Sequence, residues 1–241
     1  MSRLDDLKIK IFADGANLDK IRVLAKNPMV KGFTTNPTLM KKDGVTDYED
    51  FAREIIAAVP DFPVSLEVFA DDFDEMIAQG RAIASWGSNV NVKVPVMNTK
   101  GEFAGKVIEV LSSEGAVLNV TAIMTVEQVE KIAAVLNPNA SAIISVFAGR
   151  IADTGVDPLQ VMEDCKAALK GHPKAELLWA SPRELLNVFH ADQVGCQIIT
   201  VTDDLLKKLA LVDKDLDLYS RETVQMFYND AASSSFSIQT A

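Results

Sequence analysis

Short apolar runs and longer amphipathic stretches alternate along most of the chain. The runs are rich in β-branched residues, which is typical of buried strands, and the stretches repeat apolar residues every three to four positions, which is typical of helices that cover a core. The expected strands are 8–13, 32–35, 64–69, 90–94, 116–121, 142–147, 176–180 and 197–201. The expected helices are 18–25, 48–59, 73–86, 104–113, 126–136, 158–169, 182–189 and 203–211.

Eight strand–helix units of about 30 residues each match the usual size of a (β/α)8 barrel. The rival α/β arrangement is a doubly wound sheet, but the glycine-rich dinucleotide fingerprint found in many such sheets is missing. No stretch has the composition of a linker. We therefore predict an α/β fold in which residues 1–241 form a single (β/α)8 TIM barrel domain, including an extra C-terminal helix and tail over about 218–241.

Local signals support several helix boundaries. Asp47 and Asp157 can cap the helices that follow them, and Ser181 stands in the same position before Pro182. The extra C-terminal helix is expected over 220–231, where four apolar residues would anchor it. These anchors are Leu218, Val224, Phe227 and Tyr228.

Composition and charge narrow the function classes. With 48% hydrophobic and 24% charged residues among 241, the chain can bury a large core. The net charge of -10 argues against nucleic acid as the main partner. No apolar run approaches the roughly 20 residues of a membrane span, and the polar start lacks the regions of a secretory signal. We therefore expect no membrane association and a cytoplasmic location.

The few cysteines and histidines limit the metal and disulfide chemistry. Cys165 and Cys196 have neither a disulfide framework nor metal-site spacing, and both lie in apolar surroundings, so we expect buried free thiols. His172 and His190 are too few for a histidine-rich zinc site. We expect neither a metal nor a cofactor.

A single lysine interrupts the apolar run 90–96. Side chains alternate along a strand, so the valines share one face while Asn91 and Lys93 share the other. Burial disfavours an ammonium group, and a desolvated lysine can act as a neutral amine that forms a Schiff base with a carbonyl. The alternative is a lysine whose stem packs on apolar neighbours while its head reaches water or a carboxylate.

Polar residues close seven of the expected strands on a parity that a barrel would turn inward. Catalytic groups of (β/α)8 barrels gather at the C-terminal ends of the strands, so this pattern predicts a polar pocket. The alternative is that strands simply end at turns, where polar residues are common. The residues are Asp14, Asn36, Glu67, Lys93, Thr121, Ser145 and Ser181.

Five segments of the chain resemble, in order, the motifs of the transaldolase and fructose-6-phosphate aldolase family. They are 12–17 (FADGAN), 32–39 (GFTTNPTL), 92–95 (VKVP), 119–121 (NVT) and 145–150 (SVFAGR). The Thr-Thr-Asn-Pro segment and the strand lysine are the most specific. The resemblance implies a (β/α)8 barrel with a Schiff-base lysine on its fourth strand. Lys93 lies on the fourth strand of the independent strand count.

The resemblance also implies roles for the polar residues. Lys93 would form an iminium with a ketose, Asp14 would take the proton of the hydroxyl on the fourth carbon, and Glu67 with Thr121 would hold a water that shuttles protons. Other residues would hold the sugar hydroxyls and the phosphate. These binding residues are Asn36, Asn119, Ser145, Phe147, Arg150, Ser181 and Arg183.

Each of these residues could instead have a purely structural role. Asp14 could cap a helix, Asn36 could serve a turn, and Glu67 could merely pair with Lys93. The three polar residues of strands five and six could satisfy one another, and the two arginines could form surface ion pairs. The residues concerned are Asn119, Thr121 and Ser145, then Arg150 with Asp153 and Arg183 with Glu184.

Two positions favour one branch of the family. Glu67 and Phe147 stand where the fructose-6-phosphate aldolases resemble one another in having glutamine and tyrosine. The resemblance therefore implies a transferase that moves a dihydroxyacetone unit from a ketose phosphate (sedoheptulose 7-phosphate or fructose 6-phosphate) to an aldose phosphate, in the non-oxidative pentose phosphate pathway. The alternatives are a lyase that releases dihydroxyacetone and a non-catalytic sugar-phosphate-binding barrel. The family also implies a homo-oligomer, and the chain departs from its usual pattern at Pro182.

Overall fold

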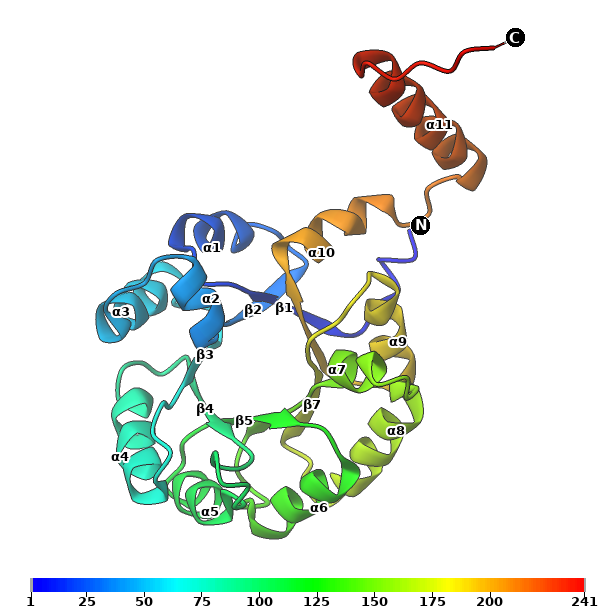
Figure 1. Ribbon diagram of the computed structural model, residues 1–241. Helices are drawn as coiled ribbons and strands as arrows, with labels where there is room; N and C mark the ends of the chain where they lie inside the picture. The colour runs from blue at the N-terminus through cyan, green and yellow to red at the C-terminus, as the bar shows by residue number, and fades with distance from the viewer. Residues whose placement is uncertain (1, 241) are drawn as a thin grey trace. The chain divides into compact units, whose positions relative to one another are not determined.

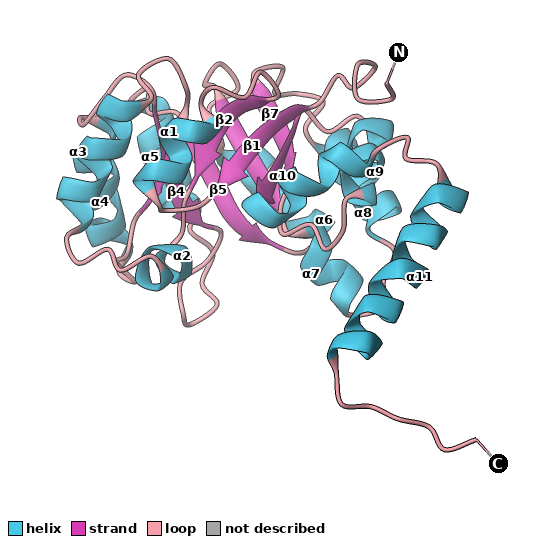
Figure 2. Ribbon diagram, turned by 90° about the horizontal axis from the view of Figure 1, so that it is seen from above, coloured by secondary structure: helices cyan, strands magenta, loops and turns pink. Residues whose placement is uncertain are grey.

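The computed structural model describes residues 2–240, which form two compact units. The larger unit, residues 7–207, contains a closed barrel of parallel strands in sequence order, with helices around it (Figure 1, Figure 2). This arrangement confirms the predicted (β/α)8 TIM barrel. The strands are β1 Lys10–Asp14, β2 Val30–Thr34, β3 Val64–Glu67, β4 Val90–Pro95, β5 Leu118–Ile123, β6 Ala142–Val146, β7 Ala175–Trp179 and β8 Ile198–Thr202.

The helices of the larger unit cover the outside of the barrel. Asp47 and Asp157 cap α3 and α8, as predicted. Two short helices, α2 and α7, were not predicted because one and a half turns show little periodicity. The helices are α1 Leu18–Leu24, α2 Pro37–Lys42, α3 Tyr48–Ala58, α4 Phe73–Ala84, α5 Gly105–Ser113, α6 Val126–Val135, α7 Ala148–Asp153, α8 Pro158–Ala168, α9 Leu186–Val194 and α10 Asp203–Lys208.

The predicted helix start at Pro182 is wrong, because α9 begins at Leu186. Ser181 does not cap it: this residue has a left-handed backbone with φ of 60°. The backbone N–H groups that follow are instead satisfied by Asn187, whose Oδ1 accepts from Arg183 and Glu184. The segment between β7 and α9 is therefore a shaped loop rather than a helical turn.

The interior of the barrel is apolar below its C-terminal end. A buried cluster combines residues from β1, β6, β7 and β8, and Phe147 packs against it. Gly32 leaves room for this packing, because a Cβ atom there would lie 2.6 Å from the ring of Phe12. Catalytic residues of such barrels gather above this filled layer, at the C-terminal ends of the strands. The cluster is Phe12, Ile143, Leu178, Ala180 and Ile198.

The smaller unit joins residues 2–6 to the segment from Lys208 onward. Asp213 accepts hydrogen bonds from the Ser2 hydroxyl (3.0 Å) and the Arg3 backbone N–H (2.8 Å). A short 3-10 helix, Leu209–Leu211, precedes α11 (Leu216–Ser233), which is longer than predicted. That residues 1–241 act as one domain stays a prediction.

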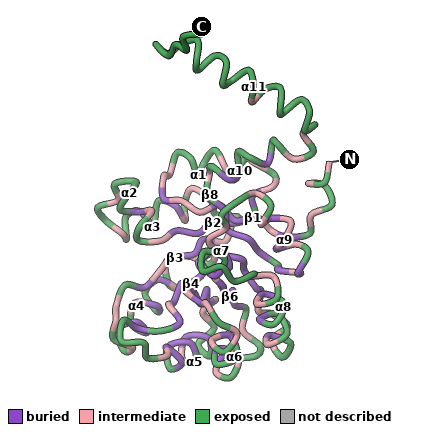
Figure 3. Tube along the Cα trace, turned by 45° about the vertical axis from the view of Figure 1, so that its right-hand side comes forward, coloured by how far each residue is buried: buried purple, intermediate pink, exposed green. Residues whose placement is uncertain are grey.

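The apolar residues of α11 are exposed. None of its described residues is buried, and Figure 3 shows the helix as exposed along its length. The four predicted anchors are between 39% and 69% exposed, and their packing role stays a prediction. Among the described residues, no helix combines the length and apolar composition that a bilayer span requires.

Candidate active site

Lys93 is buried on β4, with 8% of its surface exposed, and its amine makes two short contacts. Nζ lies 2.9 Å from a carboxylate oxygen of Glu67 and donates a 2.8 Å hydrogen bond to the Thr35 carbonyl. The first contact follows from the sheet, because Glu67 and Lys93 are partners in the parallel register of β3 and β4. A lysine attacks a carbonyl only as the neutral amine, and Glu67 is a proton acceptor within direct reach of Nζ.

Asp14 ends β1 beside its register partner Thr34, whose hydroxyl donates to Asp14 Oδ1 at 2.9 Å. Burial raises the pKa of Asp14 above its usual value, although the Lys93 charge and the Thr34 hydrogen bond oppose the rise. The charge of Glu67 adds to it. A carboxyl group with a raised pKa in a cleft is suited to accept and return a proton. We call Lys93, Glu67 and Asp14 the lysine–carboxylate centre.

Tyr48 supports this centre from α3. Its hydroxyl donates to the backbone carbonyl of Glu67 at 2.9 Å, and its ring packs edge to face against Phe69 and Trp86. Burial raises the pKa of Tyr48, so the hydroxyl stays protonated and remains a donor. The end of β3, and with it Glu67, is therefore fixed on its outer side.

Buried polar side chains continue onto β5 and β6. Ser145 Oγ donates to Asn119 Oδ1 at 2.6 Å, and Asn119 Nδ2 donates to Ser65 Oγ at 3.0 Å. Asn119 and Ser145 therefore do satisfy one another. Thr121 has no side-chain hydrogen bond to another described residue. All except Ser65 line the cavity described below, so mutual satisfaction and exposure to a ligand occur together.

Asp14 and Asn36 differ in whether they cap a helix. Asp14 does not cap α1, because Asn17 does so by accepting from the Lys20 N–H. Asn36 does cap α2, since its Oδ1 accepts from the Leu39 N–H at 3.0 Å. Asn36 also lines the cavity, so one group of its amide serves the helix and the other is left for a ligand.

Arg150 and Arg183 form what we call the arginine rim. Arg183 donates from Nε to Asp153 Oδ1 at 3.0 Å and from Nη2 to the other carboxylate oxygen, so its carboxylate partner is Asp153 rather than Glu184. Asp153 thus pairs with Arg183 rather than with Arg150. The Arg150 guanidinium carbon lies 5.2 Å from the centre of the Phe147 ring, and this side chain forms no ion pair with another described residue.

The backbone is strained at two residues that line the cavity. Ser181 and Ala122 have φ values of 60° and 63°. Such left-handed geometry is uncommon outside glycine and concentrates at functional sites. Gly149 on α7 allows the first of these, because a Cβ atom there would lie 1.6 Å from the Ser181 carbonyl oxygen.

Every residue predicted for the site lines one cavity of about 590 Å³ at the C-terminal end of the barrel. The cavity also has lining residues that were not predicted from the sequence, notably Thr34 and Thr200. A polar residue inside the otherwise apolar run of the eighth strand was the available signal for Thr200. The predicted residues are Asp14, Asn36, Glu67, Lys93, Asn119, Thr121, Ser145, Phe147, Arg150, Ser181 and Arg183.

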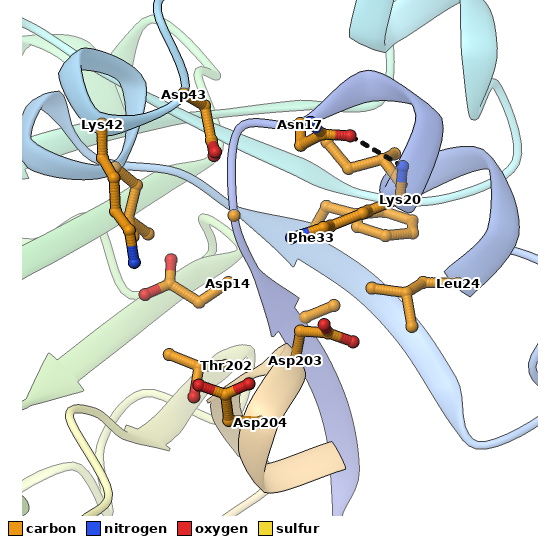
Figure 4. Close-up of a pocket in the computed structure, with 14 residues that line it drawn as sticks. Asp14, Asn17, Lys20, Leu24, Phe33, Lys42, Asp43, Thr202, Asp203 and Asp204 are labelled. Atoms are coloured by element: carbon orange, nitrogen blue, oxygen red, sulfur yellow. Dashed lines mark hydrogen bonds between the residues drawn. The ribbon is translucent and has the colours of Figure 1, made fainter. Parts of the chain in front are cut away.

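A smaller cavity of about 220 Å³ adjoins the first and shares Asp14 with it (Figure 4). Two lysines and several carboxylates line it, and the Asn17 cap of α1 forms part of its wall. Its charged residues are Lys20, Lys42, Asp43, Asp203 and Asp204. Asp14 therefore faces two spaces, of which only the larger contains Lys93.

Cysteines and histidines take no part in the cavity. Cys165 and Cys196 are buried free thiols, as predicted, and burial raises the pKa of each to about 12. His172 Nε2 lies 3.3 Å from the Leu136 carbonyl, and His190 lies beside Trp179. Among the described residues, no group of three or more His, Cys, Asp or Glu side chains is arranged to hold a metal ion.

Fold and site together define a (β/α)8 barrel protein with a buried lysine–carboxylate centre below an arginine rim. A crystal structure described as a "putative phosphonomutase" from Burkholderia cenocepacia J2315 shares the fold, with a TM-score of 0.59 over 92% of this chain and 94% of that chain. At 11% identity this likeness concerns the fold alone.

Sequence comparison identifies the family. The chain is 39% identical to a "Probable transaldolase" of Streptococcus equi subsp. zooepidemicus (strain MGCS10565), over 83% of this chain and 90% of that protein. It is 34% identical to "Probable transaldolase 2" of Listeria monocytogenes serovar 1/2a, over 89% of this chain and 95% of that protein. The family described as transaldolase/fructose-6-phosphate aldolase matches residues 11–239. The chain belongs to this family, which confirms the resemblance seen in its motifs.

Proposed function

We propose that this protein is a Schiff-base-forming, cofactor-free transaldolase. It transfers a dihydroxyacetone unit from a ketose phosphate, sedoheptulose 7-phosphate or fructose 6-phosphate, to an aldose phosphate, as a cytoplasmic step of the non-oxidative pentose phosphate pathway. One observation carries the proposal: the Lys93 amine lies 2.9 Å from the Glu67 carboxylate at the base of a cavity that Asp14 and both rim arginines also line. Membership of the family supports the choice of reaction.

The first half of the reaction uses the contact between Lys93 and Glu67. Glu67 takes a proton from the ammonium, and the free amine adds to the ketose carbonyl. The proton returns through Glu67 to the carbinolamine hydroxyl, which leaves as water and yields an iminium. Thr121, whose hydroxyl is free of other described partners, is positioned to hold that water at the cavity wall.

The second half uses Asp14. Its carboxylate accepts the proton of the hydroxyl on the fourth carbon, the bond between the third and fourth carbons breaks, and the electron pair enters the iminium to give an enamine. The aldehyde product leaves. The enamine carbon then attacks the acceptor aldehyde, Asp14 returns its proton to the new hydroxyl, and water releases the product ketose from Lys93.

Two features favour transfer over release of dihydroxyacetone. Glu67 and Phe147 occupy the positions at which the fructose-6-phosphate aldolases resemble one another in having glutamine and tyrosine. Phe147 brings no hydroxyl group to the cavity it lines, so it cannot hold a water that would protonate the enamine. The bound three-carbon unit therefore survives until an acceptor aldehyde arrives.

Borohydride trapping tests the proposal. Incubation with fructose 6-phosphate and borohydride, followed by peptide mass spectrometry, should show a reduced three- or six-carbon adduct on Lys93. Addition of erythrose 4-phosphate should divert the unit into sedoheptulose 7-phosphate, whereas a lyase would release dihydroxyacetone. Sugar-phosphate binding without any adduct would identify a non-catalytic binding barrel and refute the proposal.

We also propose that the chain works as a homo-oligomer. The large apolar residues of α11 are exposed in the single chain, and contiguous exposed apolar surface commonly marks an interface. Light scattering after size exclusion should give a mass that is a multiple of 26.2 kDa. A monomer at micromolar concentration would contradict the proposal and leave the reaction untouched.

A further inference from the structure

A chain of two hydroxyl groups leads to Asp14 from β8. Thr34 Oγ1 donates to Asp14 Oδ1 at 2.9 Å, and the same oxygen lies 2.5 Å from Thr200 Oγ1. Both threonines are buried, with 4% and 8% of their surfaces exposed. Both side chains also line the larger cavity. The pair thus links three neighbouring strands, β8, β1 and β2, at the level of the proposed proton transfer.

Counting hydrogens fixes the direction of this chain while Asp14 is ionised. A hydroxyl group has one hydrogen to donate, and a carboxylate can only accept. Thr34 donates its only hydroxyl hydrogen to Asp14. The short contact with Thr200 therefore requires that Thr200 be the donor and Thr34 the acceptor. The reverse arrangement would turn an oxygen lone pair of Thr34 toward the buried carboxylate and leave Oδ1 without its donor, which is costly.

We propose that Thr200 is a positioning residue for Asp14, acting through Thr34. Thr200 donates to the Thr34 oxygen and so directs the Thr34 hydrogen toward Asp14 Oδ1. This strengthens the hydrogen bond from Thr34 to Asp14 cooperatively. Asp14 Oδ1 is then occupied by the Thr34 hydrogen bond. Asp14 Oδ2, which has no hydrogen bond to a described residue, is left to accept the substrate proton. The inference rests on the proposed function, in which Asp14 is the base.

Other charges also act on Asp14 and must stay constant in the test. Lys93 on β4 and Glu67 on β3 face it within the larger cavity. The adjoining cavity adds lysines and carboxylates from α1, α2, the α2–α3 loop and α10 (Figure 4). An exchange of threonine for valine alters none of these charges. The charged residues of the adjoining cavity are Lys20, Lys42, Asp43, Asp203 and Asp204.

The test compares Thr200→Val with Thr200→Ser. Valine keeps the shape and removes the hydroxyl, so the pKa of Asp14 should rise by about half a unit to one unit as its donor weakens. That pKa is measured without substrate by NMR titration of the labelled Asp carboxyl carbon. We also expect kcat to fall about three- to tenfold with the acid limb moved to higher pH, while KM changes less than about twofold. Serine should restore the wild-type values.

Thr202→Val is the matched control. It makes the same replacement two residues along β8, at a hydroxyl that has no hydrogen bond to another described residue. This variant should titrate and turn over like the wild type. Thermal melting of all variants checks that they fold.

An unchanged Asp14 titration in Thr200→Val, or equal impairment in the serine variant, would show that Thr200 only packs. The titration also separates this inference from the proposed function. Absence of a borohydride adduct on wild-type Lys93 would end the proposed reaction, whereas the response of the Asp14 carboxyl to Thr200 would still be measured.

Discussion

The lysine–carboxylate centre and the arginine rim line the same cavity but are built in different ways. Lys93 and Glu67 have side chains 9% and 19% exposed, and both lie at fixed register positions of adjacent strands. Arg183 is 46% exposed and lies on a loop, and Arg150 is an exposed residue of a short helix. Strands fix atoms closely, whereas long exposed side chains retain freedom.

This difference assigns the two regions different tasks. A group that exchanges protons or forms a bond must hold its geometry to a fraction of an ångström, so it belongs on a strand that its neighbours hold in place. A group that attracts a phosphate needs charge and reach more than exact placement. Changes at the centre should therefore lower kcat, and changes at the rim should raise KM.

Lys93→Arg gives the largest expected effect. Arginine keeps a positive charge beside Glu67, so the electrostatics of the centre are preserved, but the guanidinium stays protonated and cannot form an imine. The rate of transfer should fall by about four orders of magnitude or more. A coupled assay with fructose 6-phosphate and erythrose 4-phosphate measures it. Substrate binding by calorimetry is the control and should persist; turnover near the wild-type rate would refute the Schiff base.

Asp14→Asn should rank second. The amide cannot take the proton from the sugar hydroxyl, so kcat should fall about 10²- to 10⁴-fold, while the imine on Lys93 can still form. Borohydride trapping of this variant should therefore give an adduct in which the carbon chain of the donor is intact. An adduct that contains only three carbons would mean that another group serves as the base.

The same residue makes a prediction about pH. Asp14 has a raised pKa in the fold, so the folded state holds its proton more tightly than the unfolded chain does. The stability linked to that proton is present below the usual pKa of 3.8 and is lost as pH rises through the folded pKa. At pH 7, Asp14→Asn should raise the melting temperature by about 1–5 °C, and the gain should shrink on acidification. A lower melting temperature at pH 7 would contradict the burial argument.

The lysine–carboxylate centre could be predicted from the sequence because side chains alternate along strands, which shows which residues point into the barrel. Asp14 and Glu67 end their strands, Lys93 is the only charged residue in an apolar run, and register brings Glu67 to Lys93. Thr200 was missed because a threonine is an ordinary strand residue, and its role depends on a contact with Thr34 that only the closed barrel creates.

The rim could be predicted only as a set of residues. That Arg183 would pair with Asp153 depends on the left-handed turn at Ser181 and on the close approach of Gly149, neither of which follows from residue type or spacing. The same turn is why the predicted helix at Pro182 was wrong. Loop conformation is decided by tertiary contacts, and these have no periodic signature in the sequence.

The two rim arginines should differ. Arg150 has no carboxylate partner among the described residues, so Arg150→Ala removes a whole charge-assisted contact of about 1.5–3 kcal/mol and should raise KM for phosphorylated donors about 10- to 100-fold. Asp153 already offsets the charge of Arg183, so Arg183→Ala should raise KM for phosphorylated donors only about three- to tenfold. Unphosphorylated donors provide the control, since neither change should affect them. A fall in kcat, rather than a rise in KM, would contradict the distinction between rim and centre.

Phe147→Leu should produce the smallest effect and tests how the rim is held. Leucine keeps most of the apolar contact with the barrel interior but removes the ring face over which the Arg150 guanidinium lies at 5.2 Å. A cation–π contact at an exposed site is worth about 0.5–1 kcal/mol, so KM for the phosphorylated donor should rise about two- to fivefold with kcat little changed. Phe147→Tyr keeps the ring and should leave KM near the wild-type value. In the Arg150→Ala background the leucine change should have no further effect, because the group it positions is gone; an additive loss there would mean that Phe147 contacts the substrate itself.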